Sequence, residues 1–377
     1  MNICSVRIRN FRNHADSALD FGEGINVLVG NNGQGKTNLL EAISYMSLTK
    51  SFYGASDETV LQIGKGVFEI EGRILTAAGS EHVVRCAYTL SEHVKRFTIN
   101  AAEPETLGSV IGRFPIVILS PENNAITSGA PSERRKFLDL LLSQVSRTYF
   151  EDLLEYRRVL KQRNKILLDL RGQITQRLEL LEPWDEGLIT YGSRVTRRRQ
   201  QLIQEIGHYV LSAYKELVER GEEPTLLYSC ACPGLSPEAS LGEIEAAMRT
   251  ELSRRRLEEL RRGVTLTGPH RDDMTLVLSG KTVREYASQG QHKTFLIALK
   301  LAEFFYLRER TLEAPIFLLD DVFSELDALR VACILKLISE LGQTILTTTD
   351  EGILKGAVTW SNYCRKFYVE QGMCRAA

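Results

Sequence analysis

The chain lacks any apolar run long enough to cross a membrane, and its first residues contain no apolar signal core. A membrane-spanning helix needs roughly 18 or more apolar residues. Cysteine is scarce and unpatterned: the seven cysteines form no C-x-x-C pair, so neither a disulfide framework nor a zinc site is indicated. We interpret the closest pair, Cys230 and Cys232, as chance. These absences predict a soluble, cytoplasmic protein with reduced thiols.

An excess of charge of one sign is also missing. Lys and Arg number 47 against 48 Asp and Glu, so the formal net charge is 47 − 48 = −1. A global basic field that could capture nucleic acid is therefore excluded, and any DNA binding must come from a local patch. The 377 residues are enough for a large core and for two or three domains.

The sequence patterns alternate between strands and helices at both ends, with a helical region between them. Strand patterns cover residues 6–9, 25–29, 67–74, 83–90, 96–99, 116–119, 264–267, 274–278, 316–319 and 344–348. Helical patterns follow Lys36 and cover 137–145, 156–170, 184–219, 240–262, 291–308 and 328–341. Three glycines, at 187, 192 and 207, place the continuity of the longest helix in question.

This order predicts an α/β protein whose body is interrupted by a helical insertion. The expected segments are 1–128, 129–263 and 264–377. The outer two would form one body with a sheet core and flanking helices.

A glycine-rich phosphate-binding pattern follows the strand at 25–29. It consists of Gly30, Asn31, Asn32, Gly33, Gln34, Gly35, Lys36 and Thr37. Glycines permit positive φ and a close backbone approach, so N–H groups converge on a phosphate at a helix N-terminus. Lys36 would neutralise phosphate charge and Thr37 would bind Mg²⁺. Because a strand precedes and a helix follows, a chance match is disfavoured, and we predict that the chain binds ATP and Mg²⁺.

Two carboxylates, Asp320 and Asp321, follow the apolar run at 316–319. Such a run is typical of a buried parallel strand, and ligands bind at the carboxyl ends of these strands. Asp320 suits a role toward Mg²⁺, and Asp321 suits polarising an attacking water. A plain turn at the end of the strand is the alternative.

The segment Ser288, Gln289, Gly290 and Gln291 precedes a helix about 30 residues ahead of the carboxylates. A hydroxyl and free N–H groups at a helix N-terminus suit an anion. An ordinary helix cap is the alternative interpretation of this segment.

These patterns, with residues 324–327 after them, resemble an ABC-type P-loop ATPase head. The insertion between the two halves resembles the branch of the structural-maintenance-of-chromosomes proteins. Residues 8–13, 134–139, 160–164 and 268–273 are similar to the RecF family of bacterial recombination proteins, and the similarity runs essentially from end to end. The resemblance implies a mixed-sheet head interrupted by a helical arm.

The resemblance also implies a mechanism in which two heads sandwich two ATP molecules. Each ATP would be held by the glycine loop of one subunit and by residues 288–291 of the other. Lys36, Asp321 and Ser288 would be catalytic. The implied nucleotide site also contains Arg12, Asn13, Gly290, Gln291 and Asp327, the last at the dimer seam.

Further implications concern DNA and partners. Family members bind DNA as ATP-dependent homodimers, hydrolyse ATP slowly as a switch, and help to load recombinase at gaps and stalled forks with RecO and RecR. The resemblance therefore implies a weak, DNA-stimulated ATPase in DNA replication, recombinational repair and the SOS response, without a membrane.

Several positions depart from the family or stay unassigned. Gln289 replaces a usual glycine, Tyr53 stands where Arg is common, and residues 347–349 replace the switch histidine of transporters. Residues 119–122 correspond to the loop that often supplies a Mg²⁺-binding Gln. The role of residues 270–272 stays open.

Three basic clusters in the insertion could contact DNA phosphates without reading sequence. They contain Arg157, Arg158, Lys161, Arg163 and Lys165; Arg194, Arg197, Arg198 and Arg199; and Arg254, Arg255 and Arg256. Charged helix faces are more often simply solvated.

Two other functions also remain possible. The ATP-hydrolysing subunit of a membrane transporter does not account for the insertion, and a small-molecule P-loop kinase gives residues 288–291 no role.

Overall fold

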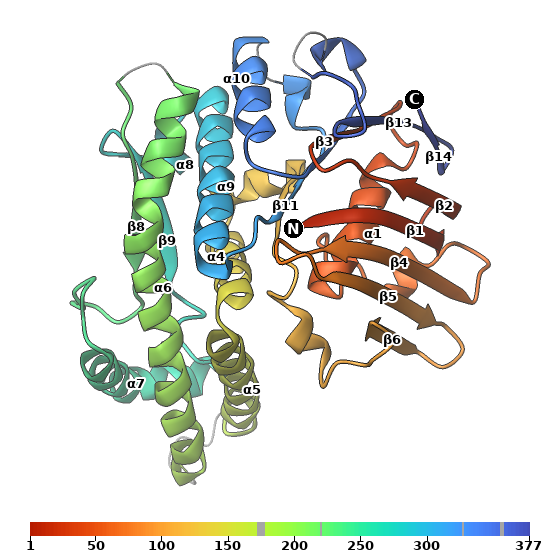
Figure 1. Ribbon diagram of the computed structural model, residues 1–377. Coiled ribbons are helices and arrows are strands. Elements are labelled where there is room, and N and C mark those ends of the chain that lie inside the picture. The colour runs from red at the N-terminus through yellow and green to blue at the C-terminus, as the bar shows by residue number, and fades with distance from the viewer. Residues whose placement is uncertain (172–177, 219–220, 326–327, 355–357) are drawn as a thin grey trace. The chain divides into compact units, whose positions relative to one another are not determined.

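The computed structural model describes residues 1–171, 178–218, 221–325, 328–354 and 358–377 (Figure 1). Two compact units make up the chain. Unit 1 comprises Met1–Asn124, Ser212–Arg220 and Leu296–Ala377, and unit 2 comprises Ala125–Leu211 and Gly221–Phe295. The units differ from the expected segments mainly because residues 264–295 belong with the helical insertion. Strand β9 (Asp273–Leu278) pairs there with β8 (Pro224–Ser229), which fixes this part of the chain in unit 2.

Unit 1 contains two sheets. The antiparallel sheet has the order β2-β1-β4-β5-β6, with β1 Asn2–Phe11, β2 His14–Asp20, β4 Val67–Leu75, β5 Glu81–Thr89 and β6 Val94–Ile99. The second sheet has the order β14-β13-β3-β12-β11-β7, with β3 Ile25–Val29, β7 Ile116–Leu119, β11 Ile316–Leu319, β12 Thr344–Thr348, β13 Arg365–Glu370 and β14 Met373–Ala376. In this sheet β14 is antiparallel and the other strands run parallel.

Helix α1 (Lys36–Leu48) lies between the two sheets of unit 1, because it contacts β1, β4 and β5 of one and β12 of the other. Eleven of its 13 residues are buried, as expected for a helix covered on nearly all sides. The strands β3, β7, β11 and β12 are buried along their whole length. Continuous apolar runs of this kind mark parallel strands covered on both faces.

The other elements of unit 1 are short helices and two longer ones. They are α2 Asp57–Val60, η1 Leu107–Val110, η2 Pro121–Asn123, η4 Val322–Glu325, α10 Ala328–Ser339, η5 Glu351–Leu354, and the part of α9 (Gln289–Thr311) from residue 296 onward. The α/β class, with a mixed sheet and flanking helices, is thereby confirmed.

Unit 2 is mainly helical and contains one small antiparallel sheet. Its helices are α3 Asn124–Ser128, α4 Pro131–Val145, α5 Arg147–Asp169, η3 Leu178–Leu181, most of α6 Glu182–Leu217, α7 Leu241–Arg262 and α8 Val283–Tyr286. The sheet consists of β10 (Lys281–Thr282), β9 and β8. Among the described residues, no helix is apolar over a sufficient length to span a bilayer.

Helix α6 is continuous over 36 residues, which confirms the long helix expected at 184–219. At 1.5 Å per residue it is about 54 Å long. Two of the glycines that placed its continuity in question serve packing. A Cβ on Gly192 would lie 2.7 Å from the Met248 side chain and 3.1 Å from Tyr156, and one on Gly187 would lie 3.2 Å from Val159. Neighbouring helices therefore approach α6 closely at these two positions.

The predicted strand at 264–267 is wrong, because side chains rather than a neighbouring strand bind its backbone. The amide of Thr265 donates to Asn164 Oδ1 at 2.8 Å, and the amide of Leu266 donates to Glu259 Oε1 at 2.7 Å. The sequence analysis also missed β2, β8, β10, β13 and β14.

Candidate nucleotide site

The glycine loop begins where β3 ends and leads directly into α1. Gly33 and Gly35 have φ angles of 78° and 110°, in the left-handed region that favours glycine. Gly35 is also the N-cap of α1, and no side chain caps this helix end. The first N–H groups of α1 thus lack a side-chain cap, which is the arrangement that binds an anion at a helix N-terminus.

The turn between β1 and β2 supports the loop from one side. Asn13 Nδ2 donates to the carbonyl of Gln34 at 3.0 Å, and His14 Nε2 lies 3.0 Å from the carbonyl oxygen of Gly35. Burial lowers the pKa of His14, which favours the neutral ring. A Cβ on Gly35 would lie 2.6 Å from the Asn13 side chain, so only glycine fits here. The structure therefore places the predicted residue Asn13 against the loop, together with His14, which the sequence analysis missed.

The turn between β13 and β14 supports the loop from the other end of the chain. The amide of Gln371 donates to Gln34 Oε1 at 2.7 Å, and the amide of Gly372 donates to the Gln34 carbonyl at 3.0 Å. Both turn residues have positive φ, at 48° and 76°, as in a two-residue hairpin of type I′. The Gln-Gly pair is a weak turn signal from which this hairpin could have been predicted, because glycine readily takes the positive φ that the turn needs.

Lys36 lies inside the loop. Its ammonium donates to the carbonyls of Gly30 and Asn31 at 2.6 and 2.9 Å. Burial lowers its pKa, and the carboxylates of Asp321 and Asp320 oppose that shift. The structure therefore brings the predicted cation of the loop and the predicted carboxylates close enough to interact.

Three hydroxyl groups converge on the carboxylate of Asp320, which is only 3% exposed. Thr37 Oγ1 donates at 2.8 and 2.9 Å to its two oxygens, Tyr53 Oη at 2.9 Å to Oδ2, and Thr347 Oγ1 at 2.8 Å to Oδ1. Burial raises the pKa of Tyr53, so its hydroxyl keeps the proton that it donates. The bond from Thr37 joins the glycine loop to a carboxylate 283 residues away in the sequence.

Asp321 follows with a φ of 46°, and its amide donates to Thr347 Oγ1 at 2.9 Å. Thr347 therefore bridges both aspartates. The amide of Asp320 donates to the carbonyl of Leu119 at 2.8 Å, because β7 and β11 pair in register. Residues 119–122 consequently begin at the end of a strand that lies beside the carboxylates, and their role toward Mg²⁺ stays a prediction.

Arg12 has a partner within the protein. Its Nε and Nη2 donate to the carboxylate of Glu41 on α1 at 2.8 and 2.9 Å. Glu41 is 1% exposed and also accepts a hydrogen bond from Ser51 Oγ. The contact between Arg12 and a nucleotide stays a prediction, although the residue lies beside the helix that follows the loop.

The segment at 288–291 lies in unit 2 and begins helix α9. The amide of Ser288 donates to Gln291 Oε1 at 2.8 Å, and the amide of Gln291 donates to Ser288 Oγ at 3.3 Å. This reciprocal pair is a capping box. Ser288 is exposed and Gly290 is partly exposed. The predicted seam residue Asp327 lies outside the described residues.

The residues present fit Mg²⁺ beside a phosphate. Across the described ranges, no group of three or more His, Cys, Asp or Glu side chains is placed to hold a metal ion. Mg²⁺ usually keeps several waters and takes one or two protein groups plus phosphate oxygens. The hydroxyl of Thr37 and the carboxylate of Asp320 supply such a pair at the end of the loop.

Most arginines of the three basic clusters have acidic partners within unit 2. The pairs are Arg157 with Asp139, Arg158 with Glu155, Arg163 with Asp185 and Glu259, Arg194 with Asp152, Arg199 with Asp139, Arg254 and Arg255 with Glu251, and Arg256 with Asp185. Arg163 and Arg199 are also buried. The clusters are therefore weaker candidates for DNA contact than their sequence suggests.

Residues 270–272, whose role the sequence left open, include a buried anchor. Asp272 is 1% exposed and accepts hydrogen bonds from Tyr228 Oη at 2.6 Å, Thr196 Oγ1 at 3.1 Å and the amide of Ala231 at 2.7 Å. It ties the end of β8 to helix α6. This part of the motif stabilises unit 2.

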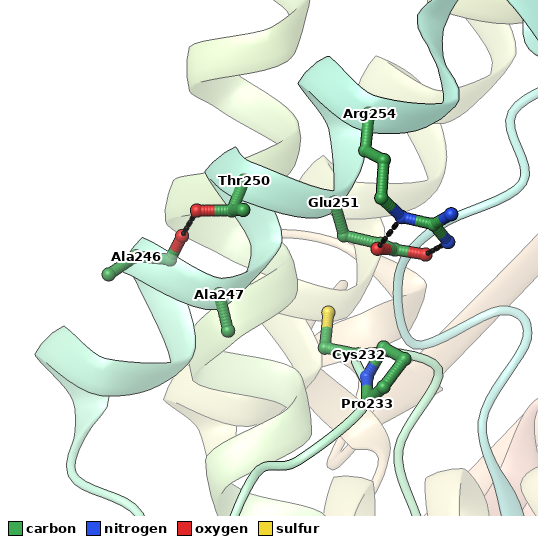
Figure 2. Close-up of a pocket in the computed structure, with 7 residues that line it drawn as sticks. All are labelled: Cys232, Pro233, Ala246, Ala247, Thr250, Glu251 and Arg254. Carbon is green, nitrogen blue, oxygen red and sulfur yellow. Dashed lines mark hydrogen bonds and ion pairs between the residues drawn. The ribbon is translucent and has the colours of Figure 1, made fainter.

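Unit 2 contains a pocket of about 400 Å³, and Figure 2 shows the residues that line it. Its lining consists of Cys232, Pro233, Ala246, Ala247, Thr250, Glu251 and Arg254. Arg254 donates two hydrogen bonds to Glu251, and this guanidinium, together with that of Arg255, lowers the pKa of the carboxyl to about 2. None of the predicted nucleotide-binding residues lines it.

Comparison with known proteins identifies the family. The family model described as RecF/RecN/SMC N terminal domain matches residues 2–374. The chain is 41% identical to the DNA replication and repair protein RecF of Salinibacter ruber over 361 residues, which cover 95% of this chain and 87% of the relative. It is also 41% identical to the protein of the same name from Chloroherpeton thalassium over 352 residues, which cover 93% of this chain and 95% of the relative.

Solved structures agree with the sequence comparison. A structure of the recombination mediator protein RecF-ATPrS in the RecFOR pathway matches with a TM-score of 0.91 and 32% identity, over 100% of this chain and 98% of that chain. An SmcHead bound to the C-winged helix domain of ScpA matches with a TM-score of 0.58 and 14% identity, over 100% of this chain and 97% of that chain, which is a likeness of fold alone. The predicted ABC-type ATPase head fold is confirmed, and the chain belongs to the RecF family within the wider group of RecF, RecN and SMC proteins.

Proposed function

We propose that the protein is an ATP-dependent DNA-binding protein of DNA replication and recombinational repair. The observation that carries this proposal is the hydrogen bond from Thr37 to Asp320, because it joins the phosphate loop and the carboxylate strand into one site. The relatives named as DNA replication and repair proteins support the process. Similarity over nearly the whole chain favours this function over the transporter and kinase alternatives.

The proposed roles follow from the chemistry of each residue. Lys36 and the loop amides bind the phosphates, and Thr37 with Asp320 holds Mg²⁺. Asp321 acts as the base toward the attacking water. Ser288 with Gly290 and Gln291 binds the terminal phosphate of the nucleotide on a second copy. Arg12, Asn13 and Asp327 complete the nucleotide site.

The proposed cycle uses ATP as a switch. ATP closes two copies into a homodimer on DNA, at single-strand gaps and junctions with duplex. Slow, DNA-stimulated hydrolysis removes the phosphate contacts and opens the dimer. Acting in the cytoplasm with RecO and RecR, the dimer helps to load recombinase, which also supports the SOS response. A neighbour solved as RecF-ATPrS in the RecFOR pathway supports the nucleotide and the pathway.

Sedimentation velocity tests the proposal, with and without ATP, Mg²⁺ and gapped duplex DNA. We expect the Asp321→Asn variant to bind ATP and accumulate as a dimer, because a carboxamide is too weak a base to activate water. Ser288→Arg should bind ATP with unchanged monomer affinity and stay monomeric. An Asp321→Asn protein that stays monomeric at every concentration, with saturating ATP and DNA, would refute the switch.

A further inference from the structure

Within the part of the chain that the structure describes, Tyr53 is the one side-chain donor to Asp320 that belongs to neither the phosphate loop nor the strand beside the carboxylates. Its Oη donates to Asp320 Oδ2 at 2.9 Å, and its ring lies 4.2 Å from that of Phe52 between centroids. The side chain that meets Oδ2 of this carboxylate is therefore a neutral hydroxyl.

The backbone of Tyr53 is held by a buried polar chain. Its amide donates to Ser51 Oγ at 3.1 Å, and Ser51 Oγ donates to Glu41 on α1. Glu41 is also bound by Arg12 at 2.8 and 2.9 Å. The direction of the Tyr53 side chain is thus set by α1, the helix that starts at the phosphate loop.

The two oxygens of Asp320 have different donors. Thr37 contacts both, Thr347 contacts Oδ1, and Tyr53 contacts Oδ2. If the Thr37 hydroxyl oxygen binds Mg²⁺, each oxygen of Asp320 keeps one donor. Thr347 donates to Oδ1 and Tyr53 donates to Oδ2. Donors of this kind orient a metal-binding carboxylate, and their loss typically weakens metal binding about 10- to 100-fold.

We infer that Tyr53 is a positioning residue that sets how strongly Mg²⁺ tightens nucleotide binding, by holding Asp320 through its Oδ2. The inference rests on the proposed function of the same site. Because the hydroxyl carries no charge, it orients the carboxylate without competing with a divalent cation. A guanidinium at this position would orient the carboxylate and compete.

The test is the affinity for a fluorescent ATP analogue in Mg²⁺ and in EDTA, expressed as the ratio of the two. Tyr53→Phe should lower this ratio by about 10-fold or more and leave the affinity in EDTA within about two-fold of wild type. Tyr45→Phe is the matched control, because Tyr45 Oη also donates to a carboxylate in unit 1, that of Asp57, at 3.0 Å. Its ratio should equal that of wild type.

A second variant, Tyr53→Arg, separates positioning from simple structural damage. It should lower the ratio and increase the Mg²⁺ concentration needed for half-maximal tightening. An unchanged ratio in Tyr53→Phe, or equal losses of affinity in Mg²⁺ and EDTA, would overturn the inference while the proposed function stands. Failure of the wild-type protein to bind nucleotide in either buffer would overturn both.

Discussion

The two units both concentrate polar side chains, but they place them differently. In unit 2, Arg163 is fully buried and each end of its guanidinium has a carboxylate partner, Asp185 and Glu259, both at 2.7 Å. In unit 1, the polar groups of the nucleotide site stand at the carboxyl edge of a parallel sheet, where Asn31 of the loop is exposed. Charges that are buried together compensate one another inside the fold, whereas polar groups beside an exposed loop are available to a ligand.

The same contrast predicts what the removal of a charged side chain does in each place. A buried ion pair gains little net stability over apolar residues, yet removing one partner leaves an unpaired buried charge. In unit 2 such a removal should therefore affect folding. In the nucleotide site of unit 1, removal of Lys36 should affect ligand binding, because its ammonium donates to backbone carbonyls, which carry no net charge. Variants in the two units can test this distinction directly.

The largest expected effect is that of Arg163→Ala. It leaves Asp185 and Glu259 without their buried cation, so the free energy of unfolding should fall by about 3–5 kcal/mol. Urea unfolding followed by circular dichroism measures the change. The matched control is Arg158→Ala on the same helix, where the paired side chains are 58% and 41% exposed, and where we expect a loss of at most about 1 kcal/mol. Equal losses in both variants would contradict the structural role of Arg163.

The second prediction concerns Lys36→Ala, which should weaken ATP binding strongly and change the stability of the fold little. ATP affinity should fall by about 10- to 100-fold or more, because a charged hydrogen-bond donor contributes roughly 1.5–3 kcal/mol. ATP-driven dimerisation should be lost with it. The free energy of unfolding without nucleotide should change much less than in Arg163→Ala. Calorimetric titration with ATP and urea unfolding provide the two measurements, and retained ATP affinity would mean that the loop is misinterpreted.

The sequence predicted the buried parallel strands of unit 1 closely, for a physical reason. The strands at 25–29, 116–119, 316–319 and 344–348 match β3, β7, β11 and β12 residue for residue, because buried parallel strands have continuous apolar runs. The loop motif and the carboxylates then follow at strand ends. Their meeting at Asp320 could be predicted from strand polarity alone.

The failures have a different origin. Residues 264–267 have a strand-like composition, but helix side chains bind their amides, which only the tertiary structure determines. Tyr53 was noticed only as a departure from the family, since no local pattern shows that its hydroxyl reaches a carboxylate 267 residues away. The basic clusters suggested DNA contacts because their partners, such as Asp139 for Arg199, are distant in sequence.

The third prediction concerns how the stability of unit 2 depends on pH. Burial lowers the pKa of His270 to about 4, and its Nδ1 lies 2.5 Å from Tyr156 Oη. The unfolded chain binds a proton near the ordinary value of 6.5, whereas the folded chain does so only near 4. The unfolded state therefore holds more protons between these values, and stability falls as pH decreases through this window. Between pH 7 and pH 5 this group should cost about 2 kcal/mol.

Urea unfolding of the wild type and of His270→Gln at pH 7 and pH 5 measures the effect. Between pH 7 and pH 5, the free energy of unfolding of the variant should fall by about 2 kcal/mol less than that of the wild type, whatever its value at pH 7. Carboxylates that titrate between pH 7 and pH 5 contribute equally in both proteins, so the difference between the two proteins removes their contribution. An identical pH dependence in the two proteins would show that His270 does not titrate in this way.

The smallest expected effect concerns the basic side chains of unit 2, and it tests whether they contact DNA phosphates. Arg254 donates to Glu251 at 2.7 and 2.6 Å, and the pKa of that carboxyl is held at about 2, so Glu251 stays ionised and offsets one of the two charges of Arg254 and Arg255. In Arg254→Gln, the slope of log affinity for DNA against log salt should change by less than about 0.3, measured by fluorescence anisotropy with the ATP-loaded Asp321→Asn protein. A lost phosphate contact would change it by about 0.9.

Lys161→Gln is the comparison for this variant, because Lys161 is exposed on α5 and belongs to none of the ion pairs found among the described residues. A slope that changes in Lys161→Gln but not in Arg254→Gln would assign DNA contact to unpaired cations only. A change of about 0.9 in Arg254→Gln would instead mean that DNA displaces Glu251 from its partner. The contrast between the nucleotide site of unit 1 and the internally paired charges of unit 2 would then fail at this position.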